Sequence, residues 1–306
     1  MRMGIVVGGQ RETLEQAVAA IVAAEEDGFD TAWRPHVMGL DCLTVLALAG
    51  QRTHRIELGS AVVPTYPRHP HALAQQAATV HGATGGRFAL GIGRSHQLVI
   101  ENMFGLEYAS GAAHMREYVT ILRALLDEGS CNVDGKLYRV HAPLDTREGK
   151  GLPILIGALM PKMLELCGRL CEGTLTWMSG PRYIEATIVP QLLAASRAAA
   201  RAMPRVVASL PVCVTDDAAA ARQFAAKHLV VYGQLPVYRA CLDAEGAAGP
   251  ADIALIGTEK EVEAGIRRVA AAGASDFYAG VFPDGIAGSD SVARSRALLK
   301  SLCGGV

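Results

Sequence analysis

The chain has 306 residues, half of them hydrophobic and 19% charged, with a formal net charge of −1. This composition supplies enough apolar material for a large core and too little charge for a disordered chain. Neither a basic excess nor a basic stripe is present, which argues against a nucleic-acid binder, and no apolar run is long enough to cross a membrane.

The first nine residues are apolar, but they lack a charged start, a long apolar centre and a cleavage site. We therefore expect a strand there rather than a signal peptide, in a protein that works in the cytoplasm without membrane or nucleic-acid partners. The seven cysteines include no CxxC pair, so they are expected to be buried thiols in a reducing compartment. His69 and His71 form an HxH without a third ligand at metal-site spacing, and we predict no metal centre.

Stretches typical of strands and of helices alternate along the chain. In the first half the predicted strands are 3–7, 29–33, 56–63 and 87–92, and the predicted helices are 13–26, 42–52, 71–84 and 115–128. In the second half the predicted strands are 153–156, 173–178, 206–214 and 275–281, and the predicted helices are 162–171, 184–202, 218–231, 258–272 and 289–302. Two segments break this rhythm: a hairpin-like stretch at 129–152 and a Gly/Pro/Ala-rich stretch at 233–252.

Eight strand-then-helix units with nearly continuous apolar strands indicate a parallel sheet covered by helices. Eight units favour closure into a (βα)8 TIM barrel of the α/β class, formed as one domain over 1–306, with insertions after strand 4 and before the last strand. Barrel enzymes place their active site at the carboxyl ends of the strands. The residues to examine are therefore those directly after each strand: 34–36, 60–64, 93–96, 157–162, 177–180 and 282–284.

Four segments of the sequence carry a family resemblance. They are LGS…P…RHPHALAQQAAT at 58–79, GGRFALGIGRS at 85–95, GALMPKMLELCGRLCEGTL at 157–175 and ALIGTEKEVEAGIRRVAAAGASDF at 254–277. Each is moderately specific, and their ordered combination resembles the bacterial luciferase-like monooxygenase family, most closely the branch that uses the deazaflavin coenzyme F420. The resemblance covers nearly the whole chain. It implies a luciferase-like barrel that transfers a hydride between F420 and a small organic substrate.

The resemblance also implies the coenzyme-binding residues. In the family a cis peptide bond between non-proline residues backs the coenzyme ring, and the matching bond here joins Ala61 and Val62, flanked by Ser60 and Pro64. Two further groups of residues match coenzyme-contacting positions. They are Gly93, Arg94 and Ser95 after strand four, and Leu159, Met160, Lys162 and Met163 at the start of a helix. Helix-start amides and basic side chains suit the anionic phosphate and glutamate tail of F420.

Two histidines are the predicted catalytic residues, because histidine can exchange the proton that accompanies hydride transfer near neutral pH. His36 follows strand two, where the family commonly places an acidic–His pair, but here Pro35 precedes it. His96 occupies a position that is Glu in the sugar-phosphate dehydrogenases of the F420 branch. These departures argue against a sugar-phosphate substrate and favour a neutral, partly apolar one.

Three functions stay open at the level of sequence. The favoured one is an F420-dependent oxidoreductase. The second is an FMN-dependent monooxygenase of the same family, which uses reduced flavin and oxygen. The third is a relative that binds no coenzyme. The resemblance further suggests a homodimer, and the sequence leaves open whether Arg34 and Trp177 face the site.

Overall fold

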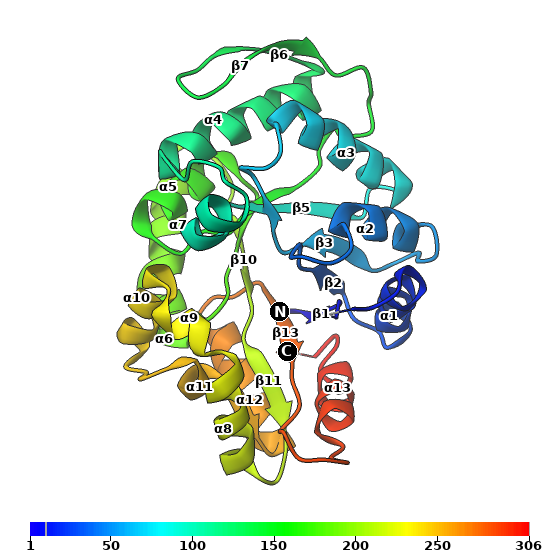
Figure 1. The fold of residues 1–306 in the computed structure, drawn as a ribbon, viewed down its shortest axis with the longest axis vertical. Helices are drawn as coiled ribbons and strands as arrows, with labels where there is room; N and C mark the ends of the chain where they lie inside the picture. The colour runs from blue at the N-terminus through cyan, green and yellow to red at the C-terminus, as the bar shows by residue number, and fades with distance from the viewer. Residues whose placement is uncertain (10, 306) are drawn as a thin grey trace.

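The computed structural model describes residues 1–9 and 11–305, and in it eight parallel strands close into a barrel surrounded by helices (Figure 1). The barrel closes because β1 pairs with β2 on one side and with β13 on the other. This confirms the (βα)8 fold predicted from the alternation. The barrel strands are β1 (Arg2–Val6), β2 (Thr31–Arg34), β3 (Glu57–Ser60), β5 (Phe88–Gly93), β8 (Ile154–Ile156), β9 (Gly173–Leu175), β10 (Arg205–Ala208) and β13 (Asp276–Val281).

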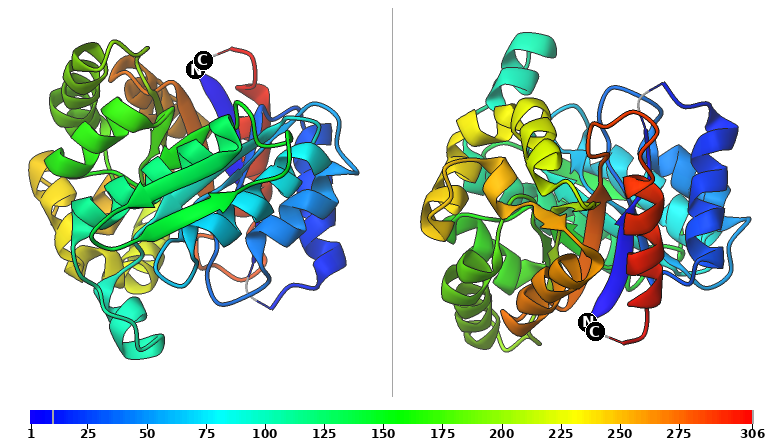
Figure 2. Two further views of the ribbon diagram at one scale, coloured as in Figure 1. Left: turned by 90° about the horizontal axis from the view of Figure 1, so that it is seen from above. Right: turned by 90° about the horizontal axis from the view of Figure 1, so that it is seen from below.

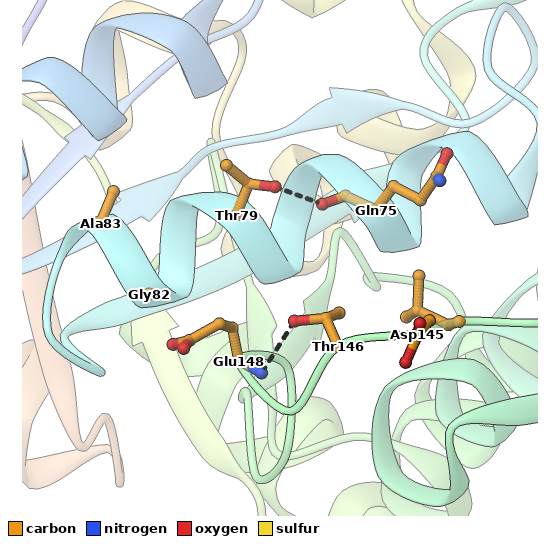
Figure 3. Close-up of a pocket in the computed structure, with 8 residues that line it drawn as sticks. Gln75, Thr79, Gly82, Ala83, Asp145, Thr146 and Glu148 are labelled. Carbon is orange, nitrogen blue, oxygen red and sulfur yellow. Dashed lines mark hydrogen bonds between the residues drawn. The ribbon is translucent and has the colours of Figure 1, made fainter.

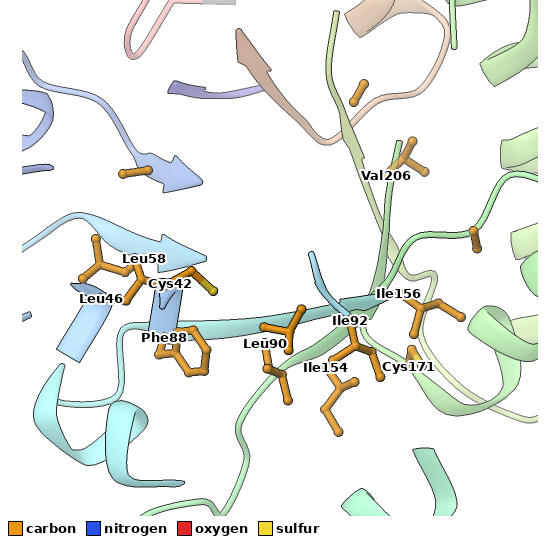
Figure 4. Close-up of a cluster of buried hydrophobic side chains, with 14 of the residues drawn as sticks. Cys42, Leu46, Leu58, Phe88, Leu90, Ile92, Ile154, Ile156, Cys171 and Val206 are labelled. Carbon is orange, nitrogen blue, oxygen red and sulfur yellow. The ribbon is translucent and has the colours of Figure 1, made fainter. Parts of the chain in front are cut away.

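Successive side chains along each strand point to opposite faces, so the barrel has an inner and an outer core. The outer core fills the space between strands and helices, and Figure 4 shows Leu58, Phe88 and Ile92 among its members. The inner core is smaller and occupies the barrel axis. It consists of Trp33, Ala89, Leu155, Leu175, Val207 and Tyr278.

The outer helices begin where the sequence supplies caps. Thr13 and Gln16 form a capping box at the start of α1, and Asp41 caps α2 through the Thr44 amide. His69 of the HxH pair accepts from the His71 amide and so caps α3. The eight outer helices are α1 (Leu14–Glu26), α2 (Cys42–Gly50), α3 (Pro70–Ala83), α4 (Gly111–Arg123), α5 (Pro161–Leu170), α7 (Val189–Ala198), α12 (Glu259–Ala271) and α13 (Ser291–Ser301).

The first insertion follows α4 and is the predicted hairpin. A π-helical turn, η2 (Ala124–Glu128), leads into β6 (Ser130–Asp134), which pairs antiparallel with β7 (Arg139–Pro143). The second insertion lies between β10 and β13 and is more helical than the sequence suggested. Besides β11 (Pro211–Val214) and β12 (Leu255–Gly257), it contains α8 (Ala218–His228), α9 (Val230–Gln234), α10 (Pro236–Glu245) and α11 (Pro250–Ile253).

Three sequence predictions need correction. No helix was predicted in the Gly/Pro/Ala-rich stretch 233–252, but Pro236 at the first turn and left-handed Gly246 at the end bound the helix α10. The single strand expected at 206–214 is interrupted, so that β10 pairs with the start of β13 and β11 with its end. The strand expected at 56–63 is likewise divided into β3 and β4 (Val63–Pro64) by the turn that contains the predicted site.

The two ends of the barrel differ in their polar groups. At the amino-terminal end, Arg205 lies between Glu57 and Asp276, with its Nη2 atom 2.9 Å and 2.6 Å from their carboxylate oxygens. Arg2 adds a further contact to Glu57 at 3.2 Å. Figure 2 shows both termini side by side at this end of the molecule, while the π-helical turn η1 (Leu98–Met103) projects from the opposite end.

Candidate functional site

The predicted coenzyme residues lie at the carboxyl ends of three adjacent barrel strands, β3, β5 and β8, an end we call the mouth. The turn after β3 carries the peptide bond between Ala61 and Val62, and this bond is cis. The Ser60 side chain ties the turn to β5: its hydroxyl donates to the Gly91 carbonyl at 2.8 Å and accepts from the Gly91 amide at 2.9 Å.

Glycines on the neighbouring strand make room for this turn. A Cβ atom at Gly91 would lie 1.9 Å from the Ser60 carbonyl oxygen, and one at Gly93 would lie 2.5 Å from Val62 Cγ2. At Gly91 the nearest atom belongs to the backbone, so no side chain larger than hydrogen fits while the turn keeps its place. At Gly93 a Cβ atom would require the Val62 side chain to move. Ala61 and Val62 are half-buried and pack on the inner core, so they form part of the floor of the mouth. Small side chains on such a floor allow a flat ring to approach the backbone closely.

Arg94, directly after β5, is a half-buried guanidinium without an acidic partner among the described residues. Its Cζ atom lies 4.2 Å from the centre of the Tyr108 ring, and its Nη2 donates weakly to the Tyr66 hydroxyl at 3.4 Å. Its Nε atom is buried and has no hydrogen-bond partner in the described part of the chain. A buried donor of this kind is costly unless a ligand or water satisfies it, and Arg94 is therefore a candidate to bind an anion.

The surroundings of Arg94 strengthen its positive potential. A Cβ atom at Gly111, the first residue of α4, would lie 3.0 Å from Arg94 Nη1, so the guanidinium lies against the amino terminus of a helix. Helix amino termini carry a partial positive charge, and no acidic residue occupies the first turn of α4. Ser95 adopts a left-handed conformation at φ 61°, held by a hydrogen bond from the Tyr108 hydroxyl to its carbonyl at 3.0 Å.

A second helix start, that of α5, carries the next group of predicted residues. Met160 is the N-cap residue and makes no side-chain capping bond, and Pro161 opens the helix. Lys162 is exposed and makes no ion pair with any described residue. Leu159 is buried and its carbonyl accepts from Tyr183 at 2.8 Å, while Met163 is half-buried. The amide of Lys162 and its ammonium group are therefore both available to an anion.

The two predicted catalytic histidines lie on different loops of the mouth. His36 Nδ1 accepts from the Cys42 amide at 3.3 Å, so the neutral ring carries its proton on Nε2. Burial and then the charge of Arg68 lower the pKa of His36, although Asp41 opposes them, and this favours the neutral form. His96 packs edge-on against Tyr238 with ring centres 5.8 Å apart, and burial lowers its pKa.

The structure also places the two residues that the sequence left open. Arg34 points outward: its inward neighbour on β2 is Trp33, and its guanidinium pairs with Glu12 before α1. It is therefore directed away from the barrel axis. Trp177, after β9, lies over the mouth, because a Cβ atom at Gly280 near the end of β13 would lie 3.0 Å from the tip of its ring.

Several mouth residues carried no signal that the sequence could reveal. His114 of α4 contacts the Thr65 hydroxyl at 2.8 Å and stacks on Tyr66 with ring centres 4.1 Å apart. His114 therefore supports the ring of Tyr66, whose hydroxyl accepts from Arg94. Tyr232 and Tyr238 come from the second insertion, whose course over the mouth could not be predicted from its composition.

Two surface hollows lie away from the mouth. One of about 490 Å³ lies between α3 and the loop after β7, and Figure 3 shows Gln75 and Thr79 on the helix facing Thr146 and Glu148. The other, of about 560 Å³, is lined by residues of α10, α11, β12 and α12. Within residues 1–9 and 11–305, no group of three His, Cys, Asp or Glu side chains is placed to hold a metal ion. No helix in the same residues is long and apolar enough to cross a membrane.

Comparison with known sequences gives one family match. The model of the luciferase-like monooxygenases matches residues 1–280. A protein from Mycobacterium tuberculosis, whose name assigns it provisionally to the coenzyme F420-dependent oxidoreductases, is 32% identical over 241 residues, which are 72% of this chain and 69% of the relative. The 5,10-methylenetetrahydromethanopterin reductase of Methanolobus tindarius is 29% identical over 209 residues, covering 68% of this chain and 64% of that enzyme.

Solved structures share the fold at low identity. An F420-dependent secondary alcohol dehydrogenase, in complex with an F420–acetone adduct, aligns over 98% of both chains with a TM-score of 0.83 and 18% identity. The oxygenating component of a 3,6-diketocamphane monooxygenase from Pseudomonas putida, in complex with FMN, aligns over 99% of this chain and 97% of that one, with a TM-score of 0.75 and 16% identity. The same fold therefore serves both coenzymes.

Proposed function

Because the chain belongs to the luciferase-like monooxygenase family, we propose that it is an F420-dependent oxidoreductase acting on a small organic substrate. The observation that carries the proposal is Arg94: an unpaired, half-buried guanidinium at a helix start, beside strand ends that are lined with glycine. F420 combines a flat ring with an anionic phosphate and tail, and these residues fit both parts. When bound, the coenzyme supplies or accepts the hydride at its ring.

The residues of this chain have separate tasks in the proposal. Ala61 and Val62 support the ring, with Ser60, Pro64 and Gly93 shaping the turn behind it. Arg94 and Ser95 hold the phosphate side, together with the helix start formed by Leu159, Met160, Lys162 and Met163. His36 presents Nε2–H to the substrate and, together with His96, holds or moves the proton that accompanies hydride transfer.

The choice of F420 over FMN rests on the relatives. The two sequence relatives described above are named for F420 or for a reductase reaction. FMN also combines a flat ring with a phosphate, so Arg94 by itself does not separate the two coenzymes. The FMN-bound structural neighbour keeps an FMN-dependent monooxygenase as the second candidate.

Titration of the purified protein with F420 and with FMN, followed by ligand fluorescence, tests the proposal. We expect micromolar or tighter binding of F420 and at least tenfold weaker binding of FMN. The reverse preference would establish the flavin monooxygenase instead. Binding of neither coenzyme would leave only the family and the fold.

A further inference from the structure

Four aromatic side chains form a continuous row at the mouth, and they come from the loops after β5 and β9 and from helices α9 and α10. Trp177 meets Tyr232 with ring centres 5.8 Å apart, Tyr232 meets Tyr238 at 5.4 Å, and Tyr238 meets His96 at 5.8 Å. All three contacts are edge-to-face, with interplanar angles of 63–82°. This geometry is the favoured one for aromatic pairs and holds each ring in a defined orientation. We call these four residues the aromatic row.

The row crosses one sector of the mouth. His96 follows β5, Trp177 follows β9, and the tip of Trp177 reaches Gly280 at the end of β13. In the barrel order, β8, β9 and β10 lie between β5 and β13, so the row passes over these strands. The turn at Ala61 and Val62 follows β3, which pairs with β5. A ring supported by that turn would lie next to the His96 end of the row.

The row carries no carboxylate and no ammonium or guanidinium group. The charged residues of α10 are engaged elsewhere: Arg239 binds Asp243 at 2.8 Å and Glu245 accepts from the Tyr183 amide at 2.6 Å. The guanidinium of Arg94 is covered by the ring of Tyr108, which lies within electrostatic range of Tyr238 in the row. The surface offered to a ligand is therefore uncharged and made of ring faces and edges.

The donors of the row that make no hydrogen bond with a described residue include the buried Nε1 atom of Trp177 and the Tyr238 hydroxyl. The Tyr238 hydroxyl lies within electrostatic range of Tyr278 in the inner core and of Tyr108. Burial raises the pKa of Tyr238, so the hydroxyl keeps its proton at all physiological pH values. A neutral phenol of this kind suits a carbonyl oxygen as its acceptor.

We propose that the aromatic row is the substrate subsite, and that it selects a neutral, flat, largely apolar molecule with a carbonyl group accepted by the Tyr238 hydroxyl. This inference rests on the proposed function, because it places the substrate next to the coenzyme-binding turn. It assigns specificity to the second insertion, which supplies two of the four rings. Tyr238 is a positioning and specificity residue in this scheme.

Binding of small probes to the F420-loaded protein, and to the protein without F420, tests the inference. Acetophenone is the neutral carbonyl probe, ethylbenzene lacks the acceptor, and 4-acetylbenzoate adds a charge; ligand-observed NMR measures their affinities. We expect acetophenone to bind at least tenfold more tightly than 4-acetylbenzoate. Tyr238→Phe should raise the Kd of acetophenone about fivefold, the value of one neutral hydrogen bond, and leave that of ethylbenzene unchanged. Tyr238→Ala should raise both by about tenfold.

Tyr138→Ala is the matched control, since Tyr138 is a half-buried tyrosine with three ring contacts outside the row. It should change none of these affinities, and all variants should bind F420 like the wild type. Failure of F420 to bind would refute the proposed function. The probe titrations without F420 would still test whether the aromatic row binds the substrate. Preferred binding of 4-acetylbenzoate, no binding of acetophenone, or equal losses in Tyr238→Ala and Tyr138→Ala would overturn the inference.

Discussion

Replacement of Arg94 by methionine should weaken the binding of the coenzyme phosphate and leave the binding of the coenzyme ring unchanged. The substitution keeps an apolar side chain against Tyr108 and removes the charge and all donors. In the structure the Nε atom of Arg94 is buried and unpartnered. Its N–H group lies on the same edge of the guanidinium as Nη2, whose only hydrogen bond, to the Tyr66 hydroxyl, is long at 3.4 Å. This edge permits two hydrogen bonds to one anion.

The magnitude follows from the environment of these donors. A hydrogen bond to a charged group contributes about 1.5–3 kcal/mol, and partial exposure of Arg94 to water places the pair near the lower limit. We take about 2 kcal/mol in total, which is about a 30-fold increase in the Kd of F420. Arg94→Lys keeps a point charge but loses the planar fork and the stacking on Tyr108, so its loss should be smaller, about fivefold.

The assay compares F420 with its ring-and-ribityl fragment, which lacks the phosphate. Arg94→Met should raise the Kd of F420 about 30-fold and leave the Kd of the fragment within about twofold of the wild-type value. Arg116→Met is the control, because Arg116 is exposed on the same helix α4 and makes no hydrogen bond or ion pair through its side chain with another described residue. An equal loss for F420 and fragment would show that Arg94 supports the ring or the fold, and no loss for either would remove it from the site.

Three further substitutions probe other parts of the argument. His36→Ala should cut turnover about 100-fold with little change in F420 affinity. Because the pKa of His36 is lowered, the acid limb of the wild-type pH–rate profile should lie below pH 6.5, and the variant should lack it. Unchanged turnover would exclude His36 from the mechanism. Burial and the charge of Arg94 lower the pKa of His114 from 6.5 to about 4, so the unfolded state binds the extra proton between these values. In urea unfolding, the titration of His114 should therefore make the free energy of unfolding about 3 kcal/mol lower at pH 4 than at pH 6.5. His114→Gln should remove this His114-dependent part of the pH dependence. Arg205→Met leaves the carboxylate of Asp276 buried without its closest cation, which should cost about 2–3 kcal/mol and lower the Tm by about 3–5 °C without affecting coenzyme affinity.

The sequence revealed most of the barrel because its signals are local. Apolar strands alternate with helical segments along the chain, and several helices carry caps or glycine stops, so these local signals fix the order β1 to α13 without reference to distant contacts. The position of the turn after β3 came from the family resemblance, which implied a cis bond between Ala61 and Val62, and the structure has this bond cis. The corrections fall where a distant neighbour decides the outcome, as at β10 and β11, which separate because each pairs with a different half of β13.

The aromatic row was beyond the reach of sequence for the same reason. Tyr232 and Tyr238 lie in a stretch of mixed composition, and only the course of α9 and α10 brings them to His96 and Trp177. The orientation of Arg34 depended on strand register, because Trp33 fills the barrel and the next residue must then point outward. Its partner Glu12 is 22 positions away in the sequence. Contacts of this kind carry no local pattern.

Charged side chains are paired at the amino-terminal end of the barrel and unpaired at Arg94 in the mouth, and this difference supports the proposed placement of the site. At the amino-terminal end, Arg205 meets two carboxylates, so each buried charge has a partner and the group contributes to stability. At the mouth, Arg94 is half-buried beside a helix start that adds to its positive potential, and no described carboxylate offsets it. Folding alone gives no reason to keep an uncompensated cation there, because an apolar residue of similar size would stabilise the fold at least as well. An anion would complete this arrangement, and under the proposed function that anion is the coenzyme phosphate, beside the floor of Ala61 and Val62.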